Sequence, residues 1–334
     1  MEYVKLGNSG LEVSKICLGC MSYGLLPGDT IRPWMLPEDE SRTMMKAAFD
    51  AGINFFDTAD IYGSGESERV LGRFVRDFIP RDEMVITTKV WNPWRKGPNG
   101  HGLSKKNLVT QLDKSLKNLG VDYIDIYMLH RFDASVPLEE TLSHLNDLVR
   151  SGKVLYLGAS SMFAWQLMKA IGIQRAHGWD QFVVMQNYYN LLYREDEREM
   201  MGMCQSEGVA VTPWSPLARG RLARPFVDNA NANSLTLRAQ SDNFSRIVLT
   251  ANEDIDRPII DKINEMAAER GVAPSQLALA WMQTKPFITA PVVGATKMKH
   301  LEDALASFNI QLSSEEITTL ESLYVPHPQT TAFV

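Results

Sequence analysis

The sequence predicts an α/β fold, a (β/α)8 TIM barrel, and three observations support this expectation. Eight short runs rich in apolar and β-branched residues recur along the 334-residue chain. Six of the seven intervals between their centres span about 27 to 40 residues, the length of one strand and one helix. No G-x-G-x-x-G follows the first run or occurs elsewhere, which disfavours the open doubly wound sheet that shares this alternation. We therefore expect residues 1–334 to form one barrel domain.

The expected elements begin with a small N-terminal β-hairpin that plugs the barrel bottom. Its strands are Val4–Leu6 and Leu11–Val13, and Asn8-Ser9-Gly10 forms the turn. The barrel strands then follow in order, as Ile16–Gly19, Asn54–Asp57, Met84–Lys89, Ile124–Leu129, Val154–Gly158, Val183–Gln186, Val209–Trp214 and Ala290–Val293.

The segments between the strands have helical patterns. One leucine stripe runs from Leu108 to Leu119 after Ser104, a good cap, and a second runs from Leu138 to Leu148 after Pro137. The polar stretch 228–245 predicts a surface loop in the seventh unit, within a longer insertion over 224–257, and an extra helix precedes the C-terminal loop that starts at Tyr324.

Composition excludes several classes of function. The net charge is −6 at pH 7, which disfavours nucleic acid as a partner. The sequence shows neither a secretory signal nor 18 consecutive apolar residues, so we expect a cytoplasmic protein without a membrane partner. The three cysteines, Cys17, Cys20 and Cys204, lack the partners of a disulfide framework or a metal site, and we expect buried, inert thiols.

Several polar residues are expected to be structural. We expect His101, His144, His177 and His327 to be solvated or to cap elements, and Asp60 to cap a turn. The charged run 194–199 predicts the exposed face of a helix start.

Four proton-capable side chains lie where strands end. Asp57, Lys89 and His130 end or follow the second, third and fourth expected strands, and Tyr62 lies in the loop after Asp57. In such barrels the carboxyl ends of the strands form the active site, so these groups are expected to share one mouth. Lys89 would lower the pKa of the Tyr62 phenol by about three units, with Asp57 as counter-ion, and His130 would orient a carbonyl. Without a nucleophile or a metal cage, the set favours carbonyl reduction with an external hydride donor.

These motifs resemble those of the aldo-keto reductase superfamily. The segments that carry the resemblance are Gly52–Gly63, Thr87–Val90, Tyr127–His130, Gly158–Ser161, Gln186–Tyr188 and Pro213–Leu217, and it runs from Leu6 to about Pro326. It implies a (β/α)8 barrel, NADPH or NADP in preference to NADH as the cofactor, and a catalytic tetrad of Asp57, Tyr62, Lys89 and His130. The segments 214–222 and 324–328 are most similar to a bacterial and fungal branch with a long loop after the seventh strand. One bacterial member of that branch is labelled as forming 1-deoxyxylulose 5-phosphate.

The resemblance also implies cofactor contacts. Ser160, Ser161 and Gln186 would lie at the nicotinamide carboxamide, Trp214 would stack on the ring, and Gly19, Cys20 and Met21 would close the near side. The pyrophosphate would be lined by Ser215, Pro216, Leu217, Arg219, Gly220 and Arg221, and the adenosine by Gly294, Thr296, Lys297, His300 and Asp303. Ser161, Trp214, His300 and Ala304 depart from residues that many members have there. The first two changes are compatible with the chemistry, whereas the last two remove groups that often hold the 2′-phosphate, so the preference for NADPH depends mainly on Lys297, with an arginine of the loop as a further candidate.

The substrate is expected to be a small aldehyde or ketone, or the corresponding alcohol, bound among loop residues. Tyr23, Trp34, Trp91 and Trp94 suggest an aromatic-walled pocket, with Arg131 as an anion anchor. Two alternatives remain open: a sugar-phosphate enzyme that forms 1-deoxyxylulose 5-phosphate, and a cofactor-sensing module like channel-associated β subunits. The sequence does not predict an oligomeric state.

Overall fold

The computed structural model describes residues 1–226, 236–242 and 253–329, and these residues form a (β/α)8 barrel. Its eight parallel strands pair in the order β10-β3-β4-β5-β6-β7-β8-β9. Their bounds are Cys17–Gly19 (β3), Phe55–Asp57 (β4), Val85–Val90 (β5), Ile124–Leu129 (β6), Val154–Ser160 (β7), Phe182–Gln186 (β8), Ala210–Val211 (β9) and Val292–Val293 (β10). All eight predicted strands are therefore confirmed, although the seventh and eighth are shorter than expected.

The barrel closes between β9 and β10 through an isolated bridge and a few backbone hydrogen bonds. Trp214 and Val292 form an isolated parallel bridge, and the backbone N–H of Val292 donates to the carbonyl of Pro213 at 2.9 Å. The closure matters for the site because it brings the segment after β9 next to the segment after β10.

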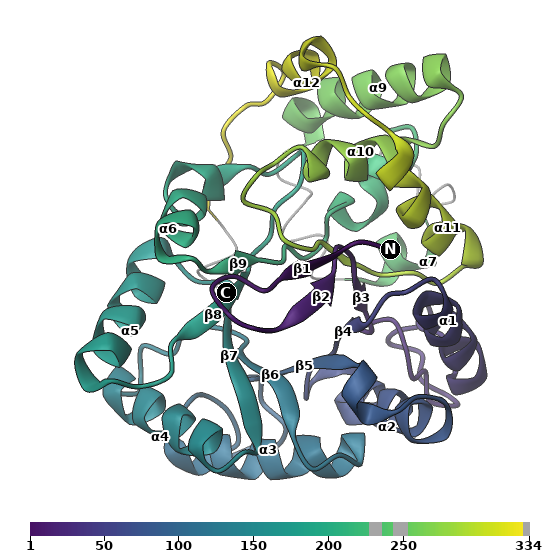
Figure 1. Cartoon of the computed structure of the whole chain (residues 1–334). Helices are drawn as coiled ribbons and strands as arrows, with labels where there is room; N and C mark the ends of the chain where they lie inside the picture. The colour runs from purple at the N-terminus through teal and green to yellow at the C-terminus, as the bar shows by residue number, and fades with distance from the viewer. Residues whose placement is uncertain (227–235, 243–252, 330–334) are drawn as a thin grey trace.

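Helices surround the strands (Figure 1). Their bounds are Glu38–Asp50 (α1), Glu66–Phe78 (α2), Lys105–Leu119 (α3), Leu138–Arg150 (α4), Ala164–His177 (α5), Met200–Glu207 (α6), Leu237–Ser241 (α7), Glu253–Arg270 (α9), Pro274–Gln283 (α10), Met298–Ala306 (α11) and Ser314–Glu321 (α12). Short 3-10 turns cover Tyr62–Gly65 (η1), Arg81–Glu83 (η2), Glu195–Arg198 (η3), Ala218–Ala223 (η4) and Ser307–Asn309 (η7). The extra C-terminal helix is α12.

Local chemistry explains where these helices begin and end. The Ser104 hydroxyl accepts the N–H of Asn107 at the start of α3, and Gly120 ends that helix in the left-handed conformation, φ 64°. Ser313 and Glu316 form a reciprocal capping box at the start of α12.

The N-terminal hairpin is also confirmed. Tyr3–Lys5 (β1) pairs antiparallel with Glu12–Ser14 (β2), and Figure 1 shows the pair crossing one end of the barrel. Leu6 and Val13 are fully buried there in one cluster with interior strand residues such as Phe55, Ile126 and Val184. A second, larger cluster fills the layer between the strands and the helices.

Several structural expectations were wrong. The run 194–199 does not expose one helix face, because Glu195 is buried and Arg194 lies between Glu197 and Glu321. His144 and His327 are buried rather than solvated. Most of the loop expected over 228–245 lies outside the described residues, and its described part contains α7. The three cysteines are buried, as expected.

Candidate active site

The four predicted catalytic side chains meet at the carboxyl ends of neighbouring parallel strands. Asp57 is the last residue of β4, Lys89 lies at the end of β5, His130 directly follows β6, and Tyr62 begins η1 after β4. The parallel register pairs Asp57 with Thr87, and Lys89 with Met128, so these ends face the same side of the barrel. Lys89 is 32 residues after Asp57, and His130 is 41 residues after Lys89. The strand order brings these distant residues together in one site.

Lys89 is the centre of the group. Its ammonium donates to Asp57 Oδ1 at 2.5 Å, to the Thr58 carbonyl at 2.9 Å and to the Tyr62 hydroxyl at 3.4 Å. The side chains of Lys89 and Asp57 are 0% and 4% exposed, so neither charge is solvated by bulk water. A buried ammonium is stable only with such a set of acceptors.

The pKa values follow from burial and these charges. Burial alone would lower the pKa of Lys89, but the Asp57 carboxylate and Tyr62 raise it above the usual value, so Lys89 stays charged. For Tyr62, desolvation raises the pKa by more than the charge of Lys89 lowers it. The expected lowering of the Tyr62 pKa was therefore wrong in sign, because removal of a phenolate from water outweighs one neighbouring cation here.

His130 is held as a neutral imidazole. Burial lowers its pKa well below the usual value, and the charges of Lys89 and Arg131 lower it further. Its ring meets the Tyr62 ring edge-on, with centroids 5.9 Å apart. The Asn92 side-chain amide lies 3.0 Å from His130 Nδ1. An amide N–H donated to Nδ1 leaves the proton on Nε2, and an N–H at Nε2 is suited to hydrogen-bond a carbonyl oxygen.

Sequence reasoning missed Asn92. It lies in the loop after β5, two residues beyond the strand, and no motif marks it. Its partner His130 is 38 residues away, so only the folded chain shows the contact.

The residues expected at the nicotinamide lie beside the tetrad. The Gln186 amide donates to Asp57 Oδ2 at 2.9 Å, and the Ser160 hydroxyl donates to the Gln186 carbonyl at 2.7 Å. The Trp214 indole N–H donates to the Ser161 hydroxyl at 3.2 Å, and its ring stacks on Tyr188 with centroids 4.6 Å apart. A planar aromatic face and amide and hydroxyl groups are thus combined next to Lys89, and this set fits a nicotinamide ring with its carboxamide.

The segment expected at the pyrophosphate has an unusual backbone. Ser215, Ala218, Arg219 and Gly220 all have positive φ values, between 46° and 95°. These values turn the backbone sharply, and the N–H groups of Ala218 and Gly220 donate within the turn, to the carbonyls of Ser215 at 2.9 Å and Leu217 at 2.8 Å. Pro216 and Leu217 complete the turn. Arg219 pairs with Asp242, and Arg221 pairs with Asp256 at 2.9 Å. A diphosphate bound here would share both guanidinium groups with their carboxylate partners.

The adenosine candidates are more dispersed. Gly294, Lys297 and His300 are exposed, Thr296 is half-buried, and the Thr296 N–H donates to His300 Nδ1 at 3.3 Å. Asp303 is different, since its carboxylate accepts from Ser275 and Gln276 on α10 and pairs with Lys299. The hydrogen bonds of Asp303 thus connect α11 to α10.

The segment that follows β3 packs against the site residues. Gly19 ends β3, the Cys20 N–H donates to the Asp57 carbonyl at 2.8 Å, and Met21 is half-buried. Tyr23 is fully buried, and its hydroxyl donates to the Ala295 carbonyl at 2.9 Å. It therefore lies in the core rather than at an open wall, and it fixes the segment after β10.

The other expected substrate residues separate into two groups. Arg131 is close to the tetrad and donates to the His130 carbonyl at 3.2 Å, Trp91 directly follows β5, and Trp34 lies under the guanidinium of Arg238. Trp94 instead packs along α3, where its indole N–H donates to Asn107 and Lys114 lies over its ring. The structure does not bring Trp94 to the tetrad.

The described ranges 1–226, 236–242 and 253–329 contain no group of three or more His, Cys, Asp or Glu side chains placed to hold a metal ion. Within the same ranges, no helix is long and apolar enough to span a membrane.

Comparison with known proteins agrees with this geometry. Residues 15–325 match the model of the aldo/keto reductase family. The chain is 41% identical to the versiconal hemiacetal acetate reductase of Aspergillus parasiticus, over 98% of this chain and 99% of that protein. It is 42% identical to a Schizosaccharomyces pombe protein provisionally named an aryl-alcohol dehydrogenase, over 98% and 96%. An aldo-keto reductase of Metarhizium robertsii is 39% identical, over 98% and 92%.

Proposed function

Because the chain belongs to the aldo/keto reductase family of oxidoreductases, which act on small carbonyl compounds, we propose that it reversibly reduces aldehydes or ketones with NADPH. The observation that carries the proposal is the Lys89 ammonium, which contacts Asp57 and Tyr62 at the end of the barrel. NADPH, when bound, supplies the hydride for the carbonyl carbon. The chain itself has to place the carbonyl and deliver one proton to its oxygen.

Tyr62 is the proton donor in this proposal. Its raised pKa keeps the phenol protonated at neutral pH, and Lys89 stabilises the phenolate that remains after the proton has moved to the substrate oxygen. Asp57 keeps Lys89 charged and in place. His130 donates from Nε2 to the same oxygen and so fixes the carbonyl in front of Tyr62.

The preference for NADPH rests on the exposed cation Lys297. It is the residue before α11, at the end of the barrel where β10 and the pyrophosphate segment meet. An ammonium there would attract the additional phosphate on the adenosine ribose. Ser160, Ser161, Gln186 and Trp214 would hold the nicotinamide, and the backbone of 215–221 the diphosphate.

Aromatic aldehydes are the substrate class that we propose. The names of two relatives refer to an aryl alcohol and to versiconal hemiacetal acetate. In this chain Trp91 directly follows β5, which carries Lys89, and aromatic side chains favour planar aromatic ligands.

The test compares Tyr62→Phe with a matched tyrosine variant. Tyr62→Phe removes the donated proton and should lower the rate of NADPH oxidation with aromatic aldehydes by about 100-fold or more. Binding of NADPH, measured by calorimetry, should stay within about threefold. Tyr127→Phe is the control, because its buried hydroxyl has no hydrogen-bond partner among the described residues and should affect neither quantity.

Equal turnover in wild type and Tyr62→Phe would remove Tyr62 from the mechanism. Tight NADPH binding with negligible turnover across the aldehydes would instead favour a cofactor-sensing role.

A further inference from the structure

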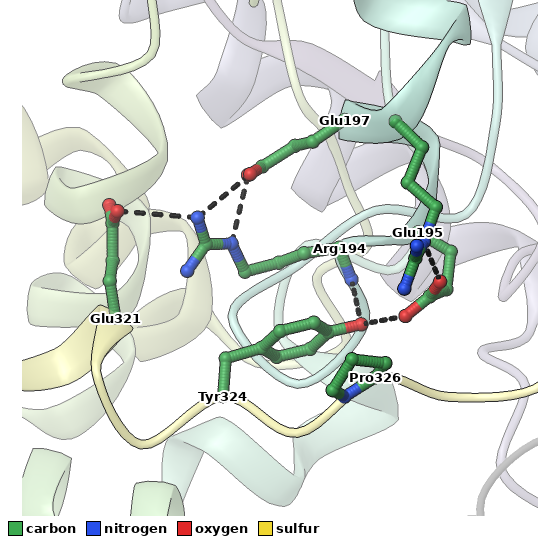
Figure 2. A pocket seen from close by; sticks show the side chains of 7 residues that line it. Arg194, Glu195, Glu197, Glu321, Tyr324 and Pro326 are labelled. Atoms are coloured by element: carbon green, nitrogen blue, oxygen red, sulfur yellow. Dashed lines mark hydrogen bonds and ion pairs between the residues drawn. The ribbon is translucent and has the colours of Figure 1, made fainter.

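The C-terminal tail, residues 324–328, is anchored by a buried carboxylate. Glu195 Oε1 accepts both the Tyr324 hydroxyl and the His327 backbone N–H, each at 2.7 Å, and Glu195 is only 3% exposed. The Tyr324 hydroxyl also accepts the backbone N–H of Arg194 at 2.9 Å. Figure 2 shows the Tyr324 ring directed from the tail toward these groups.

The anchor borders an open surface pocket of about 400 Å³ between η3, α12 and the tail (Figure 2). Its charges neutralise one another: Arg194 pairs with Glu197 and Glu321, and Arg198 pairs with Glu195. A charged ligand would have to break these pairs. We therefore interpret the residues that line this pocket as the structural contacts that hold the tail in place.

The fixed tail places His327 against a residue of the pyrophosphate region. His327 Nε2 lies 2.9 Å from Asp256 Oδ1, and both side chains are 3% exposed. Asp256 Oδ2 in turn accepts from Arg221 Nη1 at 2.9 Å. One buried carboxylate at the start of α9 is thus shared between the tail and a cation of the diphosphate segment.

A second set of contacts joins the tail to Trp214. The His327 ring meets Tyr193 edge-on at 6.1 Å, Tyr193 lies 4.8 Å from Tyr188, and Tyr188 stacks on Trp214 at 4.6 Å. His327 is therefore linked through Tyr193 and Tyr188 to Trp214, the expected nicotinamide contact. Through Asp256 it is linked to Arg221, the expected pyrophosphate contact.

We propose that His327 is a positioning residue for the dinucleotide, which acts through Asp256 on Arg221; this inference rests on the proposed function. The Asp256 carboxylate accepts from both His327 and Arg221, which holds it in one orientation. Its negative charge then attracts both groups rather than Arg221 alone. Without His327, the full attraction of Asp256 acts on Arg221, which also pairs with Glu253 at 3.4 Å, and the guanidinium is drawn away from the cofactor phosphates. His327 thus strengthens cofactor binding without contact with the cofactor.

The experiment measures NADPH binding by calorimetry and kcat at saturating NADPH. His327→Ala should weaken NADPH binding about tenfold and change kcat by less than about twofold. His327→Gln, whose amide can reach Asp256, should restore binding to within about threefold of wild type. In an Arg221→Gln background, His327→Ala should have no further effect, because the cation that it positions is absent.

His144→Ala is the matched control, since it removes another buried imidazole, on α4, and should leave NADPH binding unchanged. If His327→Ala does not fold, His327→Asn replaces it, because asparagine is polar but too short to reach Asp256.

Unchanged NADPH binding in a folded His327 variant would overturn the inference and leave the tail a purely structural role. An undiminished effect in the Arg221→Gln background would also overturn it. If wild type does not bind NADPH at all, the proposed function itself fails, and the two failures are thus distinguishable.

Discussion

At the scale of single residues, Lys89 shows how a buried charge is held by its partners. Its ammonium is held without water by Asp57, Tyr62 and the Thr58 carbonyl. Replacement of Asp57 or removal of the Tyr62 hydroxyl leaves a buried charge with fewer partners, which is more costly than loss of a surface pair.

The pH profile of reduction follows from two directions of pKa shift. Tyr62 has its pKa raised, so it remains protonated well into the alkaline range, and His130 has its pKa lowered, so it remains neutral at pH 6. The kcat for reduction should therefore be flat between about pH 6 and 9. A steady-state profile at saturating NADPH tests this. A fall from pH 7 to 6 would mean that His130 titrates in that interval.

Asp60 makes stability depend on pH. Burial, and then the charge of Glu68, raises its pKa to about 8 from the ordinary 3.8. The folded state therefore retains a proton that the unfolded state loses above pH 4, so the free energy of unfolding falls as pH rises from about 4 to 8.

Asp60→Asn removes this titration. The variant should gain at least ~1 kcal/mol in unfolding free energy relative to wild type when the pH changes from 5 to 8. Urea unfolding at both pH values measures the difference. A constant difference would show that Asp60 ionises normally in the folded chain.

At the scale of elements, the close packing of α2 on α3 depends on Gly72. A Cβ on Gly72 would lie 2.0 Å from the carbonyl oxygen of Leu119, near the end of α3. No flexible side chain can move away there, because the contact is with backbone.

Gly72→Ala should therefore destabilise the protein by about 3 kcal/mol or more, although alanine is the better helix former. Gly172→Ala on α5 is the matched change, since a Cβ there meets no atom within 4 Å. It should stabilise by about 0.5–1 kcal/mol. Thermal unfolding of both variants tests the pair, and equal effects would contradict this account of the α2–α3 contact.

At the scale of the whole molecule, the hairpin completes the barrel interior although it contributes no barrel strand. Leu6 is fully buried among side chains from the interior of the barrel. Leu6→Ala should cost about 2–5 kcal/mol of unfolding free energy, and Leu26→Ala, at a 46% exposed position, should cost about 0.5 kcal/mol or less. Denaturant unfolding compares the two. A small loss for Leu6→Ala would mean that the hairpin is only loosely attached.

Closure of the whole barrel also brings together the segments expected to bind the cofactor. The expected pyrophosphate and adenosine segments follow β9 and β10, and the barrel closes by a bridge between Trp214 and Val292. Arg219 and Arg221 then reach acidic partners on segments far along the chain, Asp242 and Asp256.

The sequence by itself determined the barrel, the hairpin and the tetrad positions. Apolar runs separated by helical stripes predict strands and helices from local composition, and the carboxyl ends of parallel strands necessarily lie on one side. The sequence therefore predicts that Asp57, Lys89 and His130 lie together.

Only the tertiary structure decided the contacts that depend on distant segments. Asn92 on His130, Asp256 on His327, the burial of Glu195 and the sign of the Tyr62 pKa shift all result from side chains that are far apart in the chain but adjacent in space. Periodicity records which face of an element is buried, but it does not record which partner covers that face. Desolvation and ion pairing depend on the partner.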